Sequence, residues 1–553
     1  MQNVMFWAAN RIRRHIPAMT AMTLAHMGQA LLGVGFALGT RLVIDSAVGG
    51  DGDAFIRACL IQGGIIAGLL LCQLLYRHLH ELLTARLDRD WKQSILRDLL
   101  HSEFSEVSRF HSGELLNRMN NDVRILNRGL LDALPNVAAL LTRLAAAMVV
   151  LAALEPWFSL VICGAGGTVI LTTGLLRRKM KKLHKAVSQQ EGRVLGFLQE
   201  TLEKLMMVQA MDAGDEMEGR GDALLADHYA AQRKRKNMLL LSNTCVNLLS
   251  HGAGFAALLW CGTKLLHGQL SFGSLTAVTQ LVNQIQMPIM NLSAVIPQYI
   301  AMSAAADRLK ELSDLEPEAE PLEATREELY QRMTSIRAEE LCFSYDRDVL
   351  MDRVSLELPK GSFAVITGSS GIGKSTLLKL LMGFRKPSLG RLYLELDGET
   401  VDAGRAARRL FAYVPQGNLL LSGTLRENLT IAKPDASEAE ICQALYVSAM
   451  DEFLPQLPDG LQTQLGESGA GLSEGQAQRL AIARAILGGA PILLLDECTS
   501  ALDVETEEKV LQRIRALPDR TCVAVTHRPA AIALCDLHLE VAEGKILVRK
   551  IAK

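Results

Sequence analysis

The residues with the clearest chemical potential form a glycine-rich segment in the second half of the chain. It reads Gly368-Ser369-Ser370-Gly371-Ile372-Gly373-Lys374-Ser375 and is followed by Thr376. The strand-like run Phe363–Ile366 precedes it, and the apolar, helix-like run Leu377–Met382 follows it. Between a strand and a helix, this spacing lets backbone N–H groups surround phosphate oxygens. We expect Lys374 to reach the β- and γ-phosphates of a nucleotide and the Ser375 hydroxyl to ligate Mg²⁺.

A pair of carboxylates lies downstream, after the apolar run Ile492–Leu495. The run reads as a buried strand that ends in Asp496 and Glu497. Asp496 can then hold the water shell of Mg²⁺, and Glu497 can polarise an attacking water. The sequence therefore predicts a site that binds and hydrolyses a nucleotide.

With these motifs, the chain resembles the ATP-binding cassette transporters. The segment Leu472-Ser-Glu-Gly-Gln476 is similar to the family signature LSGGQ and precedes the acidic strand. Tyr345 stands where the family has its adenine-stacking aromatic residue, and Gln416, in Tyr413-Val-Pro-Gln416, matches the Q-loop. Ser500-Ala-Leu-Asp503 is similar to the D-loop, and His527 to the switch histidine.

The resemblance implies a role for each matched residue. Catalysis falls to Glu497 as general base, to His527 at the γ-phosphate, and to Gln416. Mg²⁺ is held by Ser375, Gln416 and Asp496. ATP contacts Tyr345, residues 368–376 and Gln416 of one chain, and Ser473, Gly475 and Gln476 of a second chain. The resemblance therefore implies at least a dimer.

One position departs from the family pattern, because Glu474 replaces the third residue of the signature, a glycine. A carboxylate there is repelled by a triphosphate unless it points away. In asymmetric members of the family, the half with an intact catalytic glutamate often carries the altered signature. We therefore keep a heterodimer as an alternative to a slightly favoured homodimer.

The first half of the chain has a composition that water-soluble proteins do not tolerate. Only Lys264 is charged between Asn237 and Ala306. Charge-free runs of about 20 residues are long enough to cross a bilayer. They predict six spans near residues 15–40, 55–80, 133–154, 156–178, 236–264 and 272–306. The formal net charge of −2 gives no reason to expect a nucleic acid partner.

The charges between the spans predict their orientation. Residues 77–128 contain nine Lys or Arg and residues 177–236 contain thirteen, whereas the alternate connections contain very few. The positive-inside rule then places the amino terminus, both long loops and the carboxyl-terminal domain in the cytoplasm, at a cell (inner or plasma) membrane. By resemblance, each loop docks a short helix on a cassette, near Ser102–Phe110 and near Gln209–Met217. The run from His15 to Thr40 is too long for a cleaved signal peptide, so we expect it to stay as a span.

The predicted fold is a multi-domain membrane protein. An all-α, six-helix transmembrane domain at 1–310 precedes a linker at 311–335 and an α/β P-loop nucleotide-binding domain at 336–553. Arg143 is a charge inside a span, either facing a cavity or snorkelling to the surface. The sixth span carries six amides, which either line a wet path or join helices by hydrogen bonds; they are Gln280, Asn283, Gln284, Gln286, Asn291 and Gln298.

The function expected from residues and resemblance is ATP-driven export of a small molecule, a lipid or a peptide by alternating access. Two alternatives stay open. One is an exporter-fold importer of a chelated metal or siderophore, and the other is a non-transporting regulator gated by ATP. A soluble DNA-repair ATPase is excluded by the six predicted spans. No peptidase domain precedes the first span, which gives no support to processing coupled to peptide export.

Overall fold

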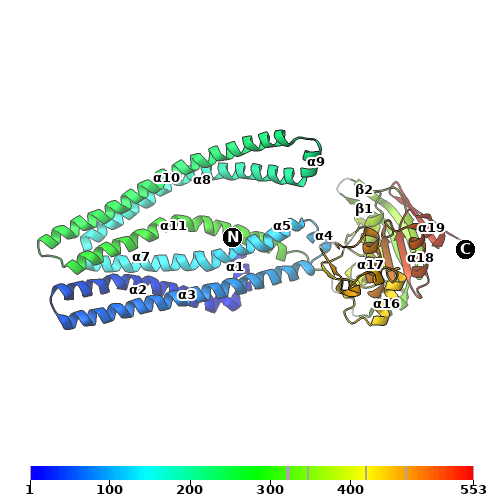
Figure 1. Ribbon diagram of the computed structural model, residues 1–553, viewed down its shortest axis with the longest axis horizontal. Helices are drawn as coiled ribbons and strands as arrows, with labels where there is room; N and C mark the ends of the chain where they lie inside the picture. Colours follow the sequence, from blue (N-terminus) through cyan, green and yellow to red (C-terminus); the bar gives the residue numbers. More distant parts are fainter. Residues whose placement is uncertain are drawn as a thin grey trace. The chain divides into compact units, whose positions relative to one another are not determined.

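The computed structural model describes residues 2–318, 324–345, 348–417, 420–466, 469 and 471–551. Within that range, the side chains of residues 2–5, 165, 169–178, 246, 287–296, 348 and 406 lie outside the description. The chain divides into two compact units (Figure 1). Unit 1 comprises Met1–Arg97 and Ser112–Asp314, and unit 2 comprises Asp98–His111 and Leu315–Lys553.

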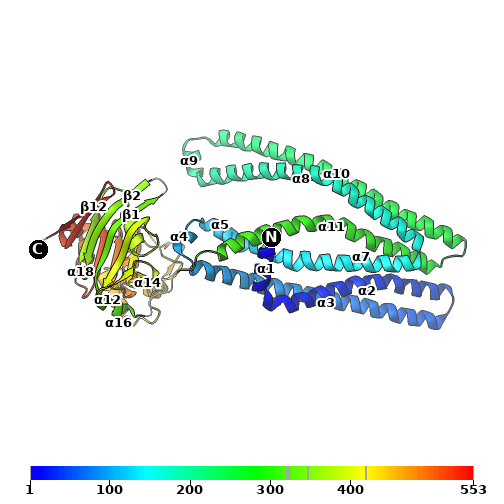
Figure 2. The ribbon, with the colours of Figure 1, turned by 180° about the vertical axis from the view of Figure 1, so that it is seen from behind.

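Unit 1 is entirely helical. Its helices are α1 (Gln2–Arg11), η1 (Arg13–His15), α2 (Ile16–Val48), α3 (Gly52–Leu100), α5 (Ser112–Asn117), α6 (Val123–Arg128), α7 (Leu134–Leu154), α8 (Pro156–Glu203), α9 (Leu205–Ala210), α10 (Gly214–Leu266) and α11 (Phe272–Ser313). Two short π-helical segments, η2 (Arg118–Asp122) and η3 (Gly129–Ala133), join α5, α6 and α7 into one continuous helical run. The long helices lie side by side (Figure 2).

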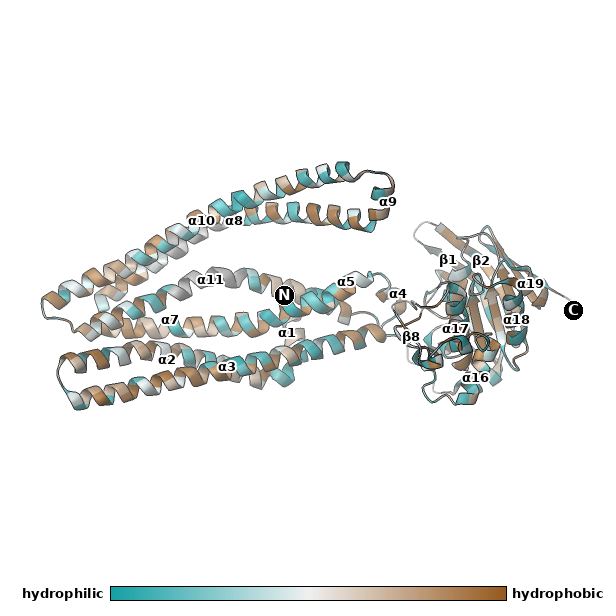
Figure 3. Cartoon of the chain, viewed as in Figure 1, coloured by the Kyte–Doolittle hydropathy of each residue, from teal (hydrophilic) through white to brown (hydrophobic). Residues whose placement is uncertain are grey.

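Four helical runs in the described part of the chain are long and apolar enough to cross a membrane. They are Arg13–Val48, Gly52–Leu100, Ser112–Leu154 and Gly214–Leu266. The helices α8 and α11 cover the predicted fourth and sixth spans, but many side chains of those spans lie outside the described residues. Figure 3 shows apolar residues along α2, α3 and α7 and many hydrophilic residues toward the α9 end of α10. The predicted count of six spans stays a prediction.

The helices of unit 1 are held together by an apolar core and by a few polar ties. Val34, Leu151, Phe158 and Leu281 belong to one buried cluster that joins α2, α7, α8 and α11. At the short α7–α8 corner, Glu155 is 3% exposed and accepts a bond of 2.6 Å from Lys264 Nζ. This ion pair joins the corner to the end of α10.

Two amides of the predicted sixth span join helices. Gln284 Nε2 donates to the Gly33 carbonyl of α2 at 2.7 Å, and Gln286 Nε2 donates to the Ser250 carbonyl of α10 at 2.9 Å. These bonds favour the interpretation of those two residues as interhelical contacts. The side chain of Asn291 and that of Pro288 lie outside the described residues.

Unit 2 contains two larger sheets and a two-stranded ladder, β7 (Gly423–Thr424) with β8 (Gln464–Leu465). An antiparallel sheet has the order β2-β1-β4-β5, with β1 (Met333–Tyr345), β2 (Asp348–Pro359), β4 (Leu389–Leu396) and β5 (Glu399–Asp402). A six-stranded sheet has the order β12-β11-β3-β10-β9-β6, with β3 (Phe363–Thr367), β6 (Phe411–Val414), β9 (Ile492–Asp496), β10 (Thr521–Val525), β11 (Leu537–Ala542) and β12 (Lys545–Lys550). The neighbouring strands β11, β3, β10, β9 and β6 are parallel, so their carboxyl ends share one edge.

The helices of unit 2 flank these sheets. They are α12 (Arg326–Arg332), α13 (Lys374–Leu381), α14 (Arg405–Arg408), α15 (Leu425–Thr430), α16 (Glu438–Val447), α17 (Glu474–Leu487), α18 (Val504–Arg515) and α19 (Pro529–Leu534). Every residue of β9 and β10 is buried. Parallel strands covered on both faces need such continuous apolar sequences. The central sheet therefore gives a rigid base for the loops at its carboxyl edge.

A short segment before the sheets belongs to unit 2. Ser102 pairs with Pro317 in an antiparallel bridge, flanked by bonds from Glu103 N to the Glu316 carbonyl at 2.9 Å and from Glu318 N to the His101 carbonyl at 2.8 Å. The helix α4 (Phe104–Val107) follows this bridge. The first predicted docking segment, Ser102–Phe110, therefore pairs with the chain that leads into the cassette.

Candidate nucleotide site

The glycine-rich loop connects β3 to α13, as the sequence predicts. Gly368, Gly371 and Gly373 have φ of +146°, +81° and +106°, in a region that favours glycine. A Cβ on Gly368 would lie 2.5 Å from the Val541 carbonyl oxygen, so the close approach to β11 also requires glycine. Ser369, Ser370 and Gly371 are exposed, whereas Thr376 is buried and Ile372 packs against the apolar core. The loop therefore presents its backbone outward from a fixed base.

The Lys374 side chain is buried within this loop, at 6% exposure. Its Nζ donates to the carbonyl oxygens of Gly368 at 2.6 Å and Ser369 at 3.0 Å. The same Nζ lies 3.0 Å from His527 Nε2 and 4.0 Å from Glu497 Oε1. The structure thus brings together three predicted residues from distant parts of the sequence.

The Asp496 carboxylate accepts one hydrogen bond at each oxygen. Ser375 Oγ donates to Oδ1 at 2.9 Å, and Tyr413 OH donates to Oδ2 at 3.0 Å. Asp496 is 1% exposed, and this burial raises the pKa of its carboxyl. The two hydrogen bonds lower that pKa, and the neighbouring Glu497 raises it. Burial and the nearby Asp496 also raise the pKa of Tyr413, which therefore stays a hydrogen-bond donor at neutral pH.

The next residue, Glu497, is held by the backbone and by Gln416. Its φ is +48°, an uncommon value for a residue with a side chain, and strained residues of this kind cluster at functional sites. Its N–H donates to the Val525 carbonyl at 2.9 Å. Gln416 Nε2 donates to Glu497 Oε2 at 2.8 Å. The predicted base and the predicted Q-loop residue are therefore direct partners.

The signature segment begins α17. Ser473 is the N-cap, and its hydroxyl accepts from Gln476 N at 3.3 Å while Gln476 Oε1 accepts from Ser473 N at 2.8 Å. This capping box is a local preference of the sequence. Glu474 is exposed in the first turn, where the helix dipole favours a carboxylate. Gly475 packs closely on the D-loop, because a Cβ there would lie 2.9 Å from the Ala501 carbonyl oxygen.

The D-loop, Ser500–Asp503, is held by residues that sequence reasoning missed. Gln478 Nε2 donates to Ser500 Oγ at 3.2 Å, and Gln478 Oε1 accepts from Ala501 N at 3.1 Å. Arg528 donates to the Ser500 carbonyl at 2.8 Å. The buried carboxylate of Glu507 accepts from Thr499 Oγ1 at 2.7 Å and pairs with Arg528 at 3.7 Å. Arg528 directly follows His527, which is the one signal in the sequence that marks it.

The predicted adenine platform, Tyr345, ends β1 and is 38% exposed. Its ring meets Phe343 edge-on at 5.0 Å between centroids, and the Arg385 guanidinium carbon lies 5.5 Å from the ring centroid. Its role toward ATP stays a prediction.

The oxygen atoms present fit Mg²⁺. The Ser375 hydroxyl and the Asp496 carboxylate are in direct contact, and hard cations prefer such ligands. In the described part of the chain, no group of three or more His, Cys, Asp or Glu side chains could hold a metal alone. A Mg²⁺ site usually needs one or two protein groups and takes its other ligands from phosphates and water.

Two family models match the chain. The model described as ABC transporter transmembrane region matches residues 19–289, and the model described as ABC transporter matches residues 351–500. A solved structure of a bacterial Atm1-family ABC exporter with ATP bound is similar, with a TM-score of 0.78 and 25% identity. That comparison covers 97% of this chain and 94% of the other.

Three curated proteins illustrate the sequence relatives. The cyclolysin secretion/processing ATP-binding protein CyaB of Bordetella pertussis is 30% identical over 72% of this chain and 54% of its own length. The alpha-hemolysin translocation ATP-binding protein HlyB of Escherichia coli is 29% identical over 84% of this chain and 66% of its own length. The uncharacterized ABC transporter ATP-binding protein YknV of Bacillus subtilis is 26% identical over 91% of this chain and 84% of its own length. The chain thus spans about half the length of the first curated relatives that it matches.

Proposed function

Because the chain belongs to the ABC transporters, with an exporter-type membrane region fused to an ATP-hydrolysing cassette, we propose that two such chains export a cargo by alternating access. The cargo is a small molecule, a lipid or a peptide. The observation that carries this proposal is the meeting of Lys374, Glu497 and His527 at one edge of the central sheet.

The geometry supports a hydrolytic role for these residues. Lys374 exchanges its bonds to the loop carbonyls for the β- and γ-phosphates of ATP. Glu497, oriented by Gln416, accepts the proton of the attacking water. His527 holds the γ-phosphate. Mg²⁺, when bound beside Ser375 and Asp496, neutralises charge on the phosphate oxygens.

Two exposed surfaces support a second chain as partner. Ser473 and Glu474 lie exposed at the start of α17, where the signature would face the ATP of the other cassette. At the tip formed by α9, Met206 is 85% exposed and Met211 is 70% exposed. By the predicted orientation, this tip lies in the cytoplasm and faces water. Exposed apolar patches on a water-facing surface mark interaction sites. We propose that it docks on the cassette of the partner chain, whether that is an identical or a different half.

The link between hydrolysis and transport is supported within unit 2. Glu103 pairs with Lys386 at 2.7 Å, and the rings of Phe104 and Phe384 are 5.0 Å apart. The segment that continues from α3 thus contacts the chain just after α13, the helix that begins with Lys374. We propose that closure of two cassettes on ATP moves this segment. The movement would switch the side of the membrane to which the cargo cavity opens.

The proposal is tested with the full chain in proteoliposomes. We expect Glu497→Gln to lower the ATPase rate by roughly a hundredfold or more while ATP binding is kept, because the water loses its base. The control is Glu505→Gln, which changes an exposed glutamate a little further along the chain. We expect this variant to keep the wild-type ATPase rate. A wild-type rate in Glu497→Gln would refute the assignment of the base.

The direction of transport is tested separately, with a panel of labelled cargos. ATP-dependent accumulation in vesicles with outward-facing cassettes supports export. Accumulation only in the opposite orientation indicates the importer of a chelated metal. Cargo-independent ATPase activity without accumulation of any compound in the panel indicates the non-transporting regulator.

A further inference from the structure

The helices α8 and α10 carry a dense group of cations where they leave the predicted fourth and fifth spans. We call this group the α8–α10 basic surface. Its members in the described part of the chain are Lys179, Lys181, Lys182, Lys185, Arg233, Lys234, Arg235 and Lys236. All of them except Arg235 are exposed, and none belongs to the nucleotide site.

The two runs of cations lie opposite each other. The helices α8 and α10 run side by side in both views of the chain (Figures 1 and 2). Arg235 Nη1 lies 3.4 Å from His184 Nδ1, so the run on α10 faces the run on α8 at the same level. Two segments that are distant in the sequence therefore combine into one positively charged surface.

The chain supplies no acid to neutralise this surface. Residues 156–190 and residues 228–306 contain no Asp or Glu, so neither helix has an acid next to its run of cations or on the membrane side of it. Among the described residues, none of the eight cations has a carboxylate partner. Eight positive charges without a counter-charge repel one another, and an external anion would relieve that repulsion.

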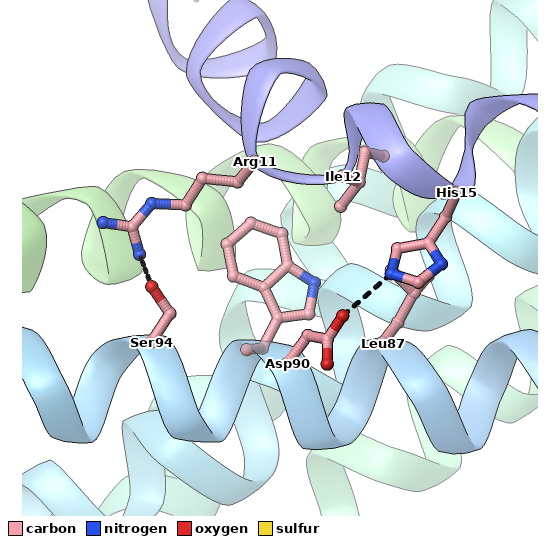
Figure 4. Close-up of a pocket in the computed structure, with 7 residues that line it drawn as sticks. Arg11, Ile12, His15, Leu87, Asp90 and Ser94 are labelled. Atoms are coloured by element: carbon pink, nitrogen blue, oxygen red, sulfur yellow. Dashed lines mark hydrogen bonds and ion pairs between the residues drawn. The ribbon is translucent and has the colours of Figure 1, made fainter.

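Other cations of unit 1 show what a neutralised charge looks like in this structure. Toward the α9 end of the same helix pair, Lys204 forms an ion pair with Glu200 at 2.8 Å. In the small pocket between α1 and α3, the Asp90 carboxylate lies 2.9 Å from His15 Nε2 (Figure 4). The charge of that histidine is therefore balanced within the chain when it is protonated. The α8–α10 basic surface has no such balance.

The position of the surface indicates which anion it meets. The predicted fourth span ends at 178 and the fifth begins at 236. With a rise of about 1.5 Å per residue, Lys185 lies roughly 10 Å beyond the fourth span and Arg233 roughly 5 Å beyond the fifth. Headgroups occupy about 5–7 Å on each side of a bilayer, and the field of their charges reaches about 8 Å further. On the membrane side of the cations, three exposed leucines follow: Leu239, Leu240 and Leu241.

We propose that the α8–α10 basic surface binds the headgroup phosphates of anionic phospholipids in the inner leaflet. The lipid supplies the negative charge that the chain lacks, and its acyl chains lie against the exposed leucines of α10. Groups of about four to eight Lys or Arg directly beside a span are typical of surfaces that bind anionic lipids. The proposal rests on the predicted spans and orientation of the proposed function, but not on export or on turnover of ATP.

The test uses the delipidated full chain in detergent, without nucleotide or cargo, so that a failure of transport cannot change its result. Native mass spectrometry measures the affinity for phosphatidylglycerol and for phosphatidylcholine with the same acyl chains, and glycerol 1-phosphate serves as a soluble competitor. The test variant combines Lys182→Gln with Arg233→Gln, and a charge-keeping variant combines Lys182→Arg with Arg233→Lys. The matched control combines Lys204→Gln with Arg220→Gln on the same two helices, where each cation is already paired with a glutamate.

We expect the wild type to bind phosphatidylglycerol more tightly than phosphatidylcholine, and a higher salt concentration to reduce this preference. Each Lys or Arg beside an anionic lipid surface strengthens binding by about fivefold. The test variant should therefore lose roughly tenfold or more of its affinity for phosphatidylglycerol. The charge-keeping variant and the control should bind as the wild type does.

Four results with these variants would overturn the proposal. Equal affinity of the wild type for both lipids would show that the headgroup charge is not recognised. Displacement of phosphatidylglycerol by an equal concentration of glycerol 1-phosphate would show a site for a free phosphate. An equal loss in the test variant and the control would show that net charge, and not this surface, sets the preference. A smaller dimer fraction with unchanged lipid affinity would show that the surface contacts the partner chain.

The predicted orientation is tested by itself. Protease is added outside sealed right-side-out vesicles that contain the full chain. We expect the tip formed by α9 to stay uncut, because it lies inside. Cleavage there would place the surface at the outer leaflet and would overturn both this proposal and the predicted orientation, whatever the result for export.

Discussion

Replacing Tyr413 by phenylalanine removes one of the two hydrogen bonds to the buried Asp496 carboxylate and leaves the ring in place. Hydrogen bonds to charged groups contribute about 1.5–3 kcal/mol, and about 1.4 kcal/mol corresponds to one pH unit. The bond from Tyr413 lowers the pKa of Asp496, so its loss must raise that pKa further. We therefore expect the acid limb of kcat/KM for ATP to move upward by roughly one pH unit.

The substitution Tyr413→Phe also changes the stability of the cassette, and the pKa of Asp496 decides the direction of that change. Burial raises the pKa of Asp496 in the folded state, so the folded chain binds more protons than the unfolded chain above the ordinary pKa of an aspartate. The contribution of this group to the free energy of unfolding is then present at low pH and lost as pH rises through the folded pKa. In Tyr413→Phe the pKa of folded Asp496 is higher still, so the free energy of unfolding continues to fall up to a higher pH. The ligand-free cassette is therefore less stable at neutral pH.

The assay is steady-state ATP hydrolysis from mildly acidic to neutral pH, with Mg²⁺ in excess. Tyr446→Phe is the matched control, since Tyr446 is 48% exposed and lies beside Arg513 on the same domain. An acid limb that stays in place in Tyr413→Phe would refute the reasoning, because the bond to Asp496 would then not influence the ionised form that binds Mg²⁺.

Three further predictions concern the signature and the segment before the cassette. Gly475→Ala should destabilise the cassette by about 1–3 kcal/mol in chemical unfolding, because the new Cβ meets the Ala501 carbonyl at 2.9 Å; an unchanged midpoint would contradict the close packing. Glu474→Gly should keep or raise the ATPase rate of a homodimer, because Glu474 is exposed and a triphosphate bound nearby would repel its carboxylate; a large loss would show a positive role for the carboxylate. Glu318→Gln should reduce cargo transport more than ATP hydrolysis, because Glu318 pairs with Arg405 at 3.1 Å and joins the linker to α14; equal losses would contradict a coupling role.

Much of the nucleotide site could be predicted because its parts are local. The glycine-rich loop, the N-cap at Ser473 and the apolar strand before Asp496 each depend on residues close together in the sequence. Their conformations follow from φ preferences, capping and burial, which act over a few residues. The two-part organisation follows in the same way, since a long segment without charge cannot remain in water.

The contacts between residues far apart in the sequence could be found only from the tertiary structure. Tyr413 reaches Asp496 across 83 residues, and Lys374 lies beside His527 across 153, because β6, β9, β10 and β3 align their carboxyl ends. The order of these strands cannot be read from composition or spacing. The sequence alone determined which residue types carry the chemistry and which segments avoid water, since both follow from local properties. The tertiary structure decided which side chains meet, since strand order and helix packing depend on the free energy of the whole fold.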